Sequence, residues 1–370
     1  MTDFIKEYAK SLTSQCPFLR SHSDLEAQLH YIVSPLEVEL PHEVFTRAKE
    51  TVNKICAYAH STDFIQKLVS RLDAHELEIL QLPVRNHAVL MAYDFHYNSE
   101  KKQLSLIEIN TNGAAFLLAL GLYKIFSDAG SPWGDPTASL RRSFENELHF
   151  ASFTGTPRVA IIDENISQQK MRLEFLLYNH LFQSWGWNSQ VLEMDQFKSE
   201  VVDLVYNRST DFLLSSQGAQ NLRKAYMKGQ LIVSPHPREY LLLAAKERLI
   251  DFLEAKVSDT LIPTKELTAE ADPDAIWEDK KSLIFKPKHS YGAKGVYKGQ
   301  SISRKKFDEI LTTDYLAQEF RQPGTIGEWK YDLRFYVYQN EIQLGAARLY
   351  QGQVTNFSTP GGGLARLKFT

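Results

Sequence analysis

The chain has 370 residues, 43% hydrophobic and 12% aromatic, and its 42 basic and 45 acidic residues leave a formal charge of -3. This composition predicts a large apolar core in two or three domains, and the absence of a basic stripe argues against a nucleic-acid-binding protein. Cys16 and Cys56 form no metal-binding spacing, no stretch reaches the ~18 apolar residues of a membrane span, and the N-terminus lacks the apolar core of a signal peptide, so we expect a soluble, cytoplasmic protein.

Residues 1–80 are predicted to be mostly helical, because apolar residues recur at spacings of three and four through "PHEVFTRAKETVNKICAYAHSTDFIQKLVSRL". The period then changes in "HAVLMAYDFHY" and "QLSLIEIN", which predict two strands of a hairpin joined by the turn "NSEKK". Residues 114–130 return to a helical pattern. Residues 1–153 are therefore the first predicted region, a helical N-terminal part plus this hairpin.

The second region, residues 154–235, alternates between strand and helix patterns. A buried strand at 156–164 leads to a helix at 168–184, then to the strand "NSQVLEM", another helix and the strand "VVDLVYNR". Such alternation predicts a small parallel α/β domain.

The third region, residues 236–370, begins within the segment "SPHPREYLLLAAKERLIDFLEAK" (234–256), which predicts a linker followed by a helix, and becomes strand-rich from about 282. The strands are predicted in "SLIFKPK", "GVYKG" and "YLAQEF". The segment "YDLRFYVYQNEIQLGAARLY" predicts a hairpin with an Asn-containing polar tip.

The first hairpin carries candidate metal ligands. Alternation puts Glu108 and Asn110 on one strand face, and the turn position puts Asp94 roughly across from Glu108. Facing carboxylates repel each other unless a cation lies between them, and these oxygen donors suit Mg²⁺ with nucleotide phosphates. The alternative is a solvated polar face on an ordinary hairpin.

The strand "SLIFKPK" contains Lys286 and leads into a loop with Gly292 and Gly295. Backbone N–H groups in such a loop can cradle phosphate, and Lys286 would add a positive charge. The alternative is a lysine and two glycines that occur near a hairpin by chance.

Asp332 and Arg334 share one strand face, and Arg348 lies on the next strand, ahead of Asn356 and the triple glycine 361–363. Two arginines with an amide and a flexible glycine loop suit an anionic group, such as a phosphate in transfer. The alternative is a surface Asp–Arg pair beside a mobile loop.

Together these residues resemble the ATP-grasp superfamily and, within it, the glutathione synthetase-like ligases. "FKPK" matches the nucleotide lysine, "YGAKG" the glycine loop, "YLAQEF" the hinge strand, "DLRFYV" the D-x-R strand, and "IEIN" the E-x-N metal strand. The resemblance covers residues 85–120 and 231–370, and 156–230 is similar to the small α/β domain that these ligases carry. Residues 1–80 are unmatched.

The order of these motifs resembles that of the eukaryotic-type glutathione synthetases, in which the E-x-N strand precedes the lysine strand, as Glu108 precedes Lys286 here. The resemblance implies an α/β (α+β) ATP-grasp fold that is circularly permuted, with chain ends that meet near the active site. That family has a glutamate ligand where this chain has His289-Ser290-Tyr291, so Asp94 takes the place of the third metal ligand.

The resemblance implies an ATP-dependent carbon–nitrogen ligase that joins a carboxylate to an amine through an acylphosphate, with ATP and Mg²⁺ as cofactors. The implied metal ligands are Asp94, Glu108 and Asn110, and the implied nucleotide contacts are Lys286, Gly292, Gly295, Asp332 and the hinge residues Ala317, Gln318, Glu319 and Phe320. Arg334, Arg348 and Asn356 would act on the transferred group, and Arg208, Gly361, Gly362, Gly363 and Arg366 would contact the substrate.

Two other functions stay open, a small-molecule kinase of the same fold and a non-catalytic ATP-binding regulatory module. For Arg208 and Arg366 the alternative is an ordinary surface arginine. The expected partners are a small carboxylate and an amine, such as an amino acid or a short peptide, and neither nucleic acid nor membrane. A homodimer is compatible with the sequence.

Overall fold

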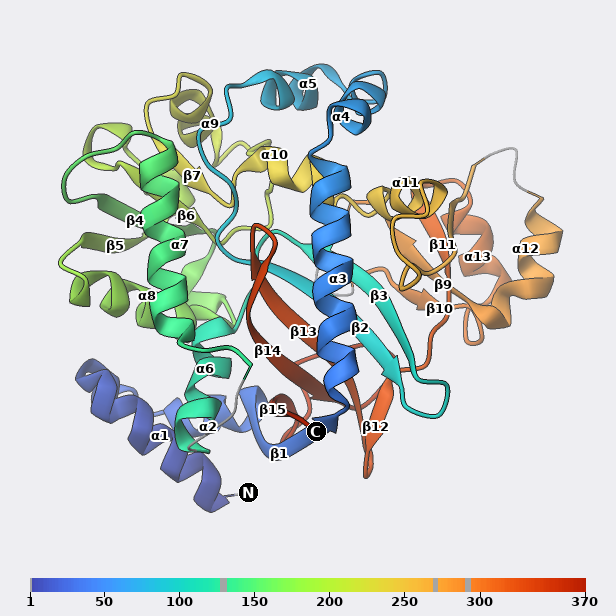
Figure 1. Cartoon of the computed structure of the whole chain (residues 1–370), viewed down its shortest axis with the longest axis horizontal. Coiled ribbons are helices and arrows are strands. Elements are labelled where there is room, and N and C mark those ends of the chain that lie inside the picture. The colour runs from blue at the N-terminus through green and yellow to red at the C-terminus, as the bar shows by residue number, and fades with distance from the viewer. Residues whose placement is uncertain (1, 127–131, 269–271, 290–293) are drawn as a thin grey trace.

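The computed structural model describes residues 2–126, 132–268, 272–289 and 294–370. It is a mixed α/β structure with three sheets, in which a central seven-stranded sheet lies between two four-stranded ones (Figure 1). No described helix is both long and apolar enough to cross a membrane.

The central sheet brings together segments from both ends of the chain. Its order is β1 (Val33–Leu40), β15 (Gly363–Phe369), β14 (Glu341–Tyr350), β13 (Trp329–Tyr338), β2 (Met91–Asn98) and β3 (Gln103–Asn110), with β12 (Gly324–Ile326) paired to β13. The predicted hairpin is confirmed as β2 and β3, and it lies beside β13, which follows more than 200 residues later. The second predicted hairpin is β13 and β14.

Residues 1–80 are mostly helical, as predicted, but they also contain strand β1, which was not predicted. It pairs in parallel with β15, and the backbone N–H of Thr370 donates to the carbonyl oxygen of Leu40. A parallel pairing with a partner some 330 residues away leaves no local signal in "VSPLEVEL". Segments from near the two ends of the chain therefore lie side by side in the central sheet, and both termini are in the lower part of Figure 1.

The rest of the N-terminal region is helical as predicted, and helices surround the central sheet. Helix α3 crosses its front (Figure 1). The helices are α1 (Thr2–Gln15), α2 (Leu25–Ile32), α3 (His42–Ala59), α4 (Thr62–Val69), α5 (Ala74–Gln81), α6 (Phe116–Ile125), α7 (Pro136–Phe150), α8 (Arg172–Ser184), α9 (Gln220–Met227), α10 (Pro237–Glu239), α11 (Arg248–Glu254), α12 (Pro273–Asp279) and α13 (Arg304–Ile310).

The second region is a small parallel sheet, as predicted. Its order is β5 (Asn188–Glu193), β4 (Arg158–Asp163), β6 (Leu204–Asn207) and β7 (Ile232–Ser234). The helix predicted between β5 and β6 is wrong: only two short 3₁₀ turns, Met194–Gln196 and Ser199–Val201, connect these strands. The carboxyl ends of β4 and β6 lie side by side where the order reverses, the position at which open α/β sheets bind ligands.

The third sheet belongs to a lobe with its own apolar core. Its order is β10 (Tyr297–Lys298), β9 (Leu283–Pro287), β11 (Tyr315–Glu319) and β8 (Thr264–Glu266), and the core packs around Phe285 and Phe307. The chain enters this lobe through residues 234–256, which were predicted as a linker followed by one helix. They instead form α10, a π-helical turn (Tyr240–Ala244) and α11, with a break at residues 245–247.

Candidate active site

One face of the central sheet gathers the predicted carboxylates and arginines in neighbouring register positions. Asp94 on β2 is paired with Glu108 on β3 and with Arg334 on β13, and Asp332 on β13 is paired with Arg348 on β14. Directly opposed residues share a face, so these five side chains form a continuous polar band across four strands. The predicted position of Asp94 across from Glu108 is confirmed.

Asp94 is the centre of this band and is only 1% exposed. Arg334 donates to both of its oxygens, at 2.8 Å from Nε and 2.7 Å from Nη2, and Nη2 of Arg348 lies 2.9 Å from Oδ2. Burial raises the pKa of the Asp94 carboxyl, but the two guanidinium groups outweigh it and hold the pKa below its ordinary value. Asp94 is thus an ionised anchor for two buried arginines.

The second arginine is fixed by another carboxylate. Arg348 donates to both oxygens of Asp332, at 2.7 and 2.8 Å, and the hydroxyl of Thr355 also donates to Asp332. Paired N–H donors on a carboxylate hold the plane of a guanidinium in one orientation. Thr355 was not predicted, and it ties the segment after β14 to the band.

Glu108 and Asn110 form the half-buried edge of the band on β3. The amide nitrogen of Asn110 lies 3.2 Å from Asp94 Oδ2 and 3.3 Å from Glu108 Oε1. Rotating this amide by 180° would put its oxygen, instead of its nitrogen, beside the two carboxylates. Asp94, Glu108 and Asn110 would then offer only oxygen ligands, which Mg²⁺ prefers. In the present arrangement N–H donors contact both oxygens of Asp94, so Glu108 and Asn110 are the more accessible ligands.

Two lysines face this edge from the third region. Nζ of Lys286 on β9 donates to the carbonyl oxygen of Ile107 at 3.2 Å, and Nζ of Lys246 donates to the carbonyl oxygen of Lys288 at 3.3 Å. Burial lowers the pKa of both lysines, and the charge of Glu108 opposes that shift in each. Lys286 is 6% exposed, so this is a buried ammonium group beside the proposed metal ligand.

Sequence reasoning missed Lys246. It lies in the break between the π-helical turn and α11, where the backbone leaves the regular helix. A single lysine after the apolar run "YLLLAA" was the available signal, because a charged side chain directly after such a run is costly unless it has a partner.

The loop after β3 connects the band to the parallel sheet. Arg334 and the hydroxyl of Tyr336 both donate to the carbonyl oxygen of Ala114, at 3.4 and 2.9 Å. Glu174, fully buried on α8, accepts from the backbone N–H groups of Ala115 and Leu117 at the start of α6, where a carboxylate is favoured. Glu174 is a second buried carboxylate that was not predicted.

Arg208 follows β6 and reaches the same loop. It is 5% exposed, its Nη2 lies 3.8 Å from Glu174 and donates to the carbonyl oxygen of Gly113 at 3.5 Å, and its guanidinium lies over the ring of Tyr206. The surface-arginine alternative for Arg208 is therefore wrong. Among the described residues, four buried polar atoms lack a hydrogen-bond partner around this junction: Arg208 Nε, Thr111 Oγ1, Asn112 Oδ1 and Ser209 Oγ. Such atoms together mark a place where a polar ligand would satisfy them.

Other predicted residues are not brought to the band. The amide nitrogen of Asn356 donates to the carbonyl oxygens of Gln351 and Val354, so this side chain holds its own loop. Arg366 forms an ion pair with Glu37 on β1 and lies over the ring of Phe126. Their roles as a catalytic residue and a substrate contact stay predictions.

The triple glycine is buried rather than a flexible loop at the surface. Gly361 and Gly363 have positive φ values of 84° and 95°, and a Cβ on Gly363 would overlap the backbone of Ile32. These glycines are needed for the turn into β15, where only a residue without a side chain fits.

The hinge strand is β11. The N–H groups of Glu319 and Phe320 donate to the carbonyl oxygens of Pro263 and Ser282, at 2.9 and 2.7 Å, and the amide of Gln318 donates to Thr264. These two N–H groups are thus used within the lobe, and Ala317 belongs to its apolar core. Gly295 has a φ of 72° and accepts from the hydroxyl of Tyr315, whereas Gly292 lies outside the described residues.

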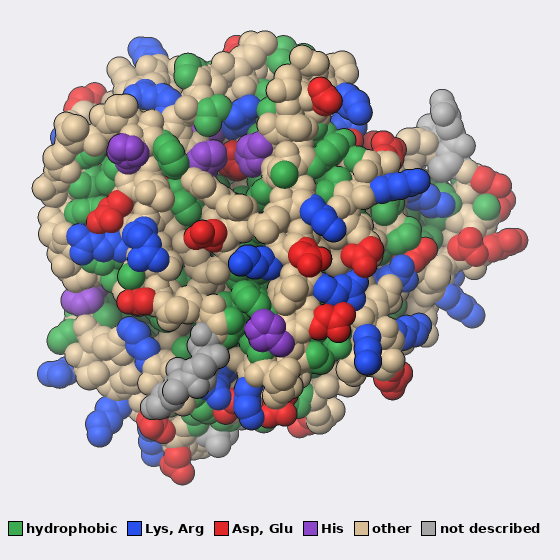
Figure 2. Space-filling model, in the orientation of Figure 1, with side chains coloured by type: hydrophobic (Ala, Val, Ile, Leu, Met, Phe, Trp, Pro, Cys, Tyr) green, Lys and Arg blue, Asp and Glu red, His purple; other side chains and the backbone are tan. Residues whose placement is uncertain are grey.

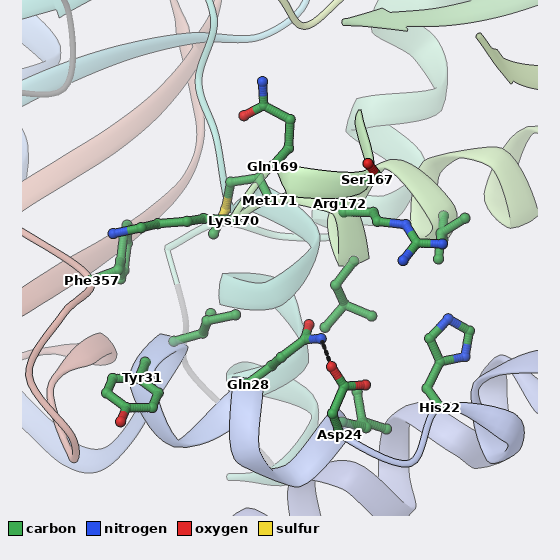
Figure 3. A pocket seen from close by; sticks show the side chains of 14 residues that line it. His22, Asp24, Gln28, Tyr31, Ser167, Gln169, Lys170, Met171, Arg172 and Phe357 are labelled. Atoms are coloured by element: carbon green, nitrogen blue, oxygen red, sulfur yellow. Dashed lines mark hydrogen bonds between the residues drawn. The ribbon is translucent and has the colours of Figure 1, made fainter. Parts of the chain in front are cut away.

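A pocket of about 350 Å³ lies between α2, the start of α8 and the segment after β14. Figure 3 shows Lys170 extending toward Phe357, while Asp24 and Gln28 form the opposite wall with a hydrogen bond of 2.5 Å. Phe357 lies two residues beyond Thr355, so the segment that contacts Asp332 also forms part of this pocket.

No protein-family model and no curated protein sequence matches the chain. Among solved structures it is similar to a Methylobacillus flagellatus KT protein to which the activity of a gamma-glutamylcysteine synthetase is attributed, with 11% identity, a TM-score of 0.49, and 90% of this chain and 89% of that chain covered. It is also similar to the D-cycloserine synthetase DcsG, with 15% identity, a TM-score of 0.33, and 45% of this chain and 59% of that chain covered. A third similar structure is the ATP-grasp ligase PsnB in a complex with a phosphomimetic variant of its minimal precursor, Mg and ADP, with 12% identity, a TM-score of 0.32, and 54% of this chain and 78% of that chain covered. Since all three TM-scores lie below 0.5, the function is inferred from the side chains.

Proposed function

We propose that the chain is an ATP-dependent carboxylate–amine ligase with a circularly permuted ATP-grasp arrangement. The observation that carries this proposal is the meeting of Lys286 and Lys246 with Glu108, next to the buried Arg334–Asp94–Arg348 network. Four buried or half-buried cations beside an all-oxygen donor set suit a polyphosphate with its magnesium ion. The permuted order is supported by β2 and β3 lying beside β13 in one sheet.

Magnesium would be held by Glu108 and Asn110, with Asp94 as the third predicted ligand once an N–H donor leaves one of its oxygens. It would supply positive charge that neutralises the phosphates. Lys286 and Lys246 would contact the phosphates as point charges. The lobe around β9 and β11 would cover the nucleotide base, with the predicted hinge 317–320 at its edge.

In the proposed reaction a substrate carboxylate oxygen attacks the γ-phosphorus of ATP, and the bond to the β,γ-bridging oxygen breaks to release ADP. The acylphosphate is then attacked by an amine, which forms the amide, loses a proton and expels phosphate. Arg334 and Arg348 are oriented by Asp94 and Asp332, which places their guanidinium groups to stabilise the charge on the transferred group.

The substrate carboxylate or amine would bind at the junction of the β3–α6 loop with the end of β6. Arg208 supplies a buried positive charge there, and Asp163 at the end of β4 supplies a carboxyl that acts on Arg208 through its charge. A buried cation and a buried carboxyl at one sheet edge suit a molecule with both an amine and a carboxylate, such as an amino acid or a short peptide.

An ADP-release screen over pairs of amino acids and dipeptides with Mg²⁺, read by mass spectrometry for the amide, tests this proposal. Release of ADP that requires both an acid and an amine and yields an amide supports it. A stable phosphorylated product without an amide would instead identify a kinase, and bound but unchanged ATP with every pair would identify a regulatory module.

A further inference from the structure

A second cluster of side chains that could bind a metal lies apart from the active site, just before the start of β2. It consists of His60, which follows α3, His87, which precedes β2, and Glu239 at the end of α10. Their ligand atoms all lie within 4.8 Å of one another. Figure 2 shows histidine side chains with an acidic one between them in the upper part of the molecule, in the region where Figure 1 places α10.

Both ring nitrogens of His60 face hydrogen-bond acceptors, although a neutral imidazole has only one N–H to donate. Its Nδ1 lies 2.8 Å from the carbonyl oxygen of Cys56, which can only accept, so Nδ1 carries the hydrogen. Its Nε2 lies 3.1 and 3.0 Å from the two oxygens of Glu239. A neutral ring would therefore direct the lone pair of Nε2 at a carboxylate, and a proton or a metal cation is needed between them.

The separations of both histidines from Glu239 suit a metal centre. Nδ1 of His87 lies 3.7 Å from Oε1 of Glu239, and Nε2 of His60 lies 3.0 Å from Oε2. Zinc bonds of about 2.1 Å in a tetrahedron place neighbouring ligand atoms roughly 3.4 Å apart, within this range. A metal-bound histidine commonly donates its other ring N–H to a backbone carbonyl, as His60 does to Cys56.

The cluster is both anchored and accessible. Glu239 is 3% exposed, whereas the side chains of His60 and His87 are 32% and 28% exposed and open into a cavity of about 260 Å³. Cys56 also lines this cavity, but its thiol donates to the carbonyl oxygen of Gln339 at 3.0 Å. Three protein ligands with room for a water is the arrangement of an open zinc site.

We propose that His60, His87 and Glu239 bind one zinc ion or a similar borderline divalent metal. Two imidazoles and a carboxylate select such a metal over Mg²⁺, so this site is chemically distinct from the one at Glu108. The ion connects the end of α3, the entry to β2 and α10, the element that leads to Lys246. Because it binds only the folded chain, it stabilises the junction from which Lys246 approaches the active site.

The test is zinc binding by the full-length protein, after removal of metals with a chelator, in the presence of millimolar Mg²⁺. We expect one zinc per chain by metal analysis of the dialysed protein, a rise in the melting temperature with zinc, and visible absorption of tetrahedral Co²⁺ when cobalt replaces it. His60→Ala and His87→Ala each lower the zinc affinity at least ~10-fold. The matched control is His149→Ala, a nearby exposed histidine, which leaves it unchanged.

Glu239 is buried, so the test relies on the variants of the two half-buried histidines, and their folding is checked by circular dichroism. Glu108→Ala retains the zinc, which separates this site from the proposed magnesium site. Failure of the wild-type chain to bind zinc or cobalt overturns the proposal and leaves the cluster as an ion pair. Equal zinc binding by the wild-type, His60→Ala and His87→Ala proteins overturns it as well.

Discussion

The ammonium group of Lys286 lies 3.2 Å from the carbonyl oxygen of Ile107, the residue directly before Glu108. This contact joins two segments that are 179 residues apart and belong to different sheets. A second contact holds the same strand, because the backbone N–H of Leu106 donates to the carbonyl oxygen of Thr260 at 2.8 Å. The lysine lobe is thus fixed against the strand that carries the proposed metal ligands.

The first prediction concerns the two lysines. Lys286→Ala and Lys246→Ala each lose about 10²–10³ in ATP turnover, because a positioned charge is removed from the phosphates. Lys286→Met keeps the apolar volume of the buried stem and gives the same loss in a stably folded chain. Turnover is measured by ADP release, and the exposed Lys281→Ala serves as the control with wild-type activity.

The second prediction concerns Glu108. Glu108→Ala leaves a folded protein without measurable ATP turnover, because the accessible carboxylate ligand of the proposed magnesium site is lost. The protein is titrated with Mg²⁺ at a fixed ATP concentration. Glu100→Ala, at the exposed turn of the same hairpin, keeps the wild-type Mg²⁺ dependence. Near-normal turnover in Glu108→Ala would refute the assignment.

The third prediction concerns the anchoring role of Asp94. Asp94→Asn lowers the free energy of unfolding by about 3–5 kcal/mol, because two buried guanidinium groups lose the charge that they share. Urea denaturation measures it. Asp259→Asn removes one partner of an exposed ion pair with Arg47 and changes stability by less than about 1 kcal/mol. A similar small change in Asp94→Asn would show that the arginines do not depend on it.

The fourth prediction is a pH dependence from Asp163. Burial raises the pKa of its carboxyl to about 6. A carboxyl with a higher pKa in the folded than in the unfolded chain favours folding below about pH 4, and this contribution is lost as the pH rises through about 6. Asp163→Asn is therefore more stable than the wild type at pH 8, by on the order of 3 kcal/mol, and has no such advantage at pH 4.

Thermal unfolding of the Asp163→Asn and wild-type proteins across this pH range measures the difference. Asp195→Asn replaces an exposed carboxylate in the same domain and gives a pH-independent difference near zero. The same small difference at every pH for Asp163→Asn would contradict the raised pKa.

The fifth prediction tests whether the triple glycine is structural. Gly363→Ala destabilises the fold, because the residue has a φ of 95° and its added Cβ would overlap the backbone of Ile32. Gly218→Ala is the control, since its nearest neighbours would lie 3.7 and 3.8 Å away. Melting temperatures compare the two variants. A soluble, equally stable Gly363→Ala protein would restore the flexible-loop interpretation.

Local patterns predicted much of this arrangement. Alternation along "MAYDFHYN" and "QLSLIEIN" gave the hairpin and the pairing of Asp94 with Glu108, since strand period and turn position are local properties. The resemblance to ATP-grasp ligases, rather than any local pattern, implied that Lys286 lies close to that hairpin, and its ammonium group does contact Ile107. The role of Asp94 as an anchor for two arginines could not be predicted, because Arg334 and Arg348 come from β13 and β14, which join β2 in one sheet only in the folded chain.

The remaining errors have the same origin. Lys246 was missed because the chain breaks from a π-helical turn where the pattern predicts one continuous helix. Thr355, whose hydroxyl donates to Asp332, was missed because a residue in an irregular loop leaves no periodic signal. The glycines 361–363 were interpreted as flexible because the close approach of Ile32 depends on β1, the strand that the local pattern did not predict.

The most direct test of the central claim is a double-mutant cycle for the binding of Mg²⁺–ATP between Glu108 and Lys286, measured by titration calorimetry. The account predicts that each wild-type chain binds one ATP when Mg²⁺ is present, and that Glu108→Ala and Lys286→Met each bind it at least ~10-fold more weakly. The loss of binding free energy in the double variant is smaller than the sum of the two single losses, because both side chains act on one metal–nucleotide complex. Wild-type affinity in both single variants, or no ATP binding by the wild-type chain, would contradict it.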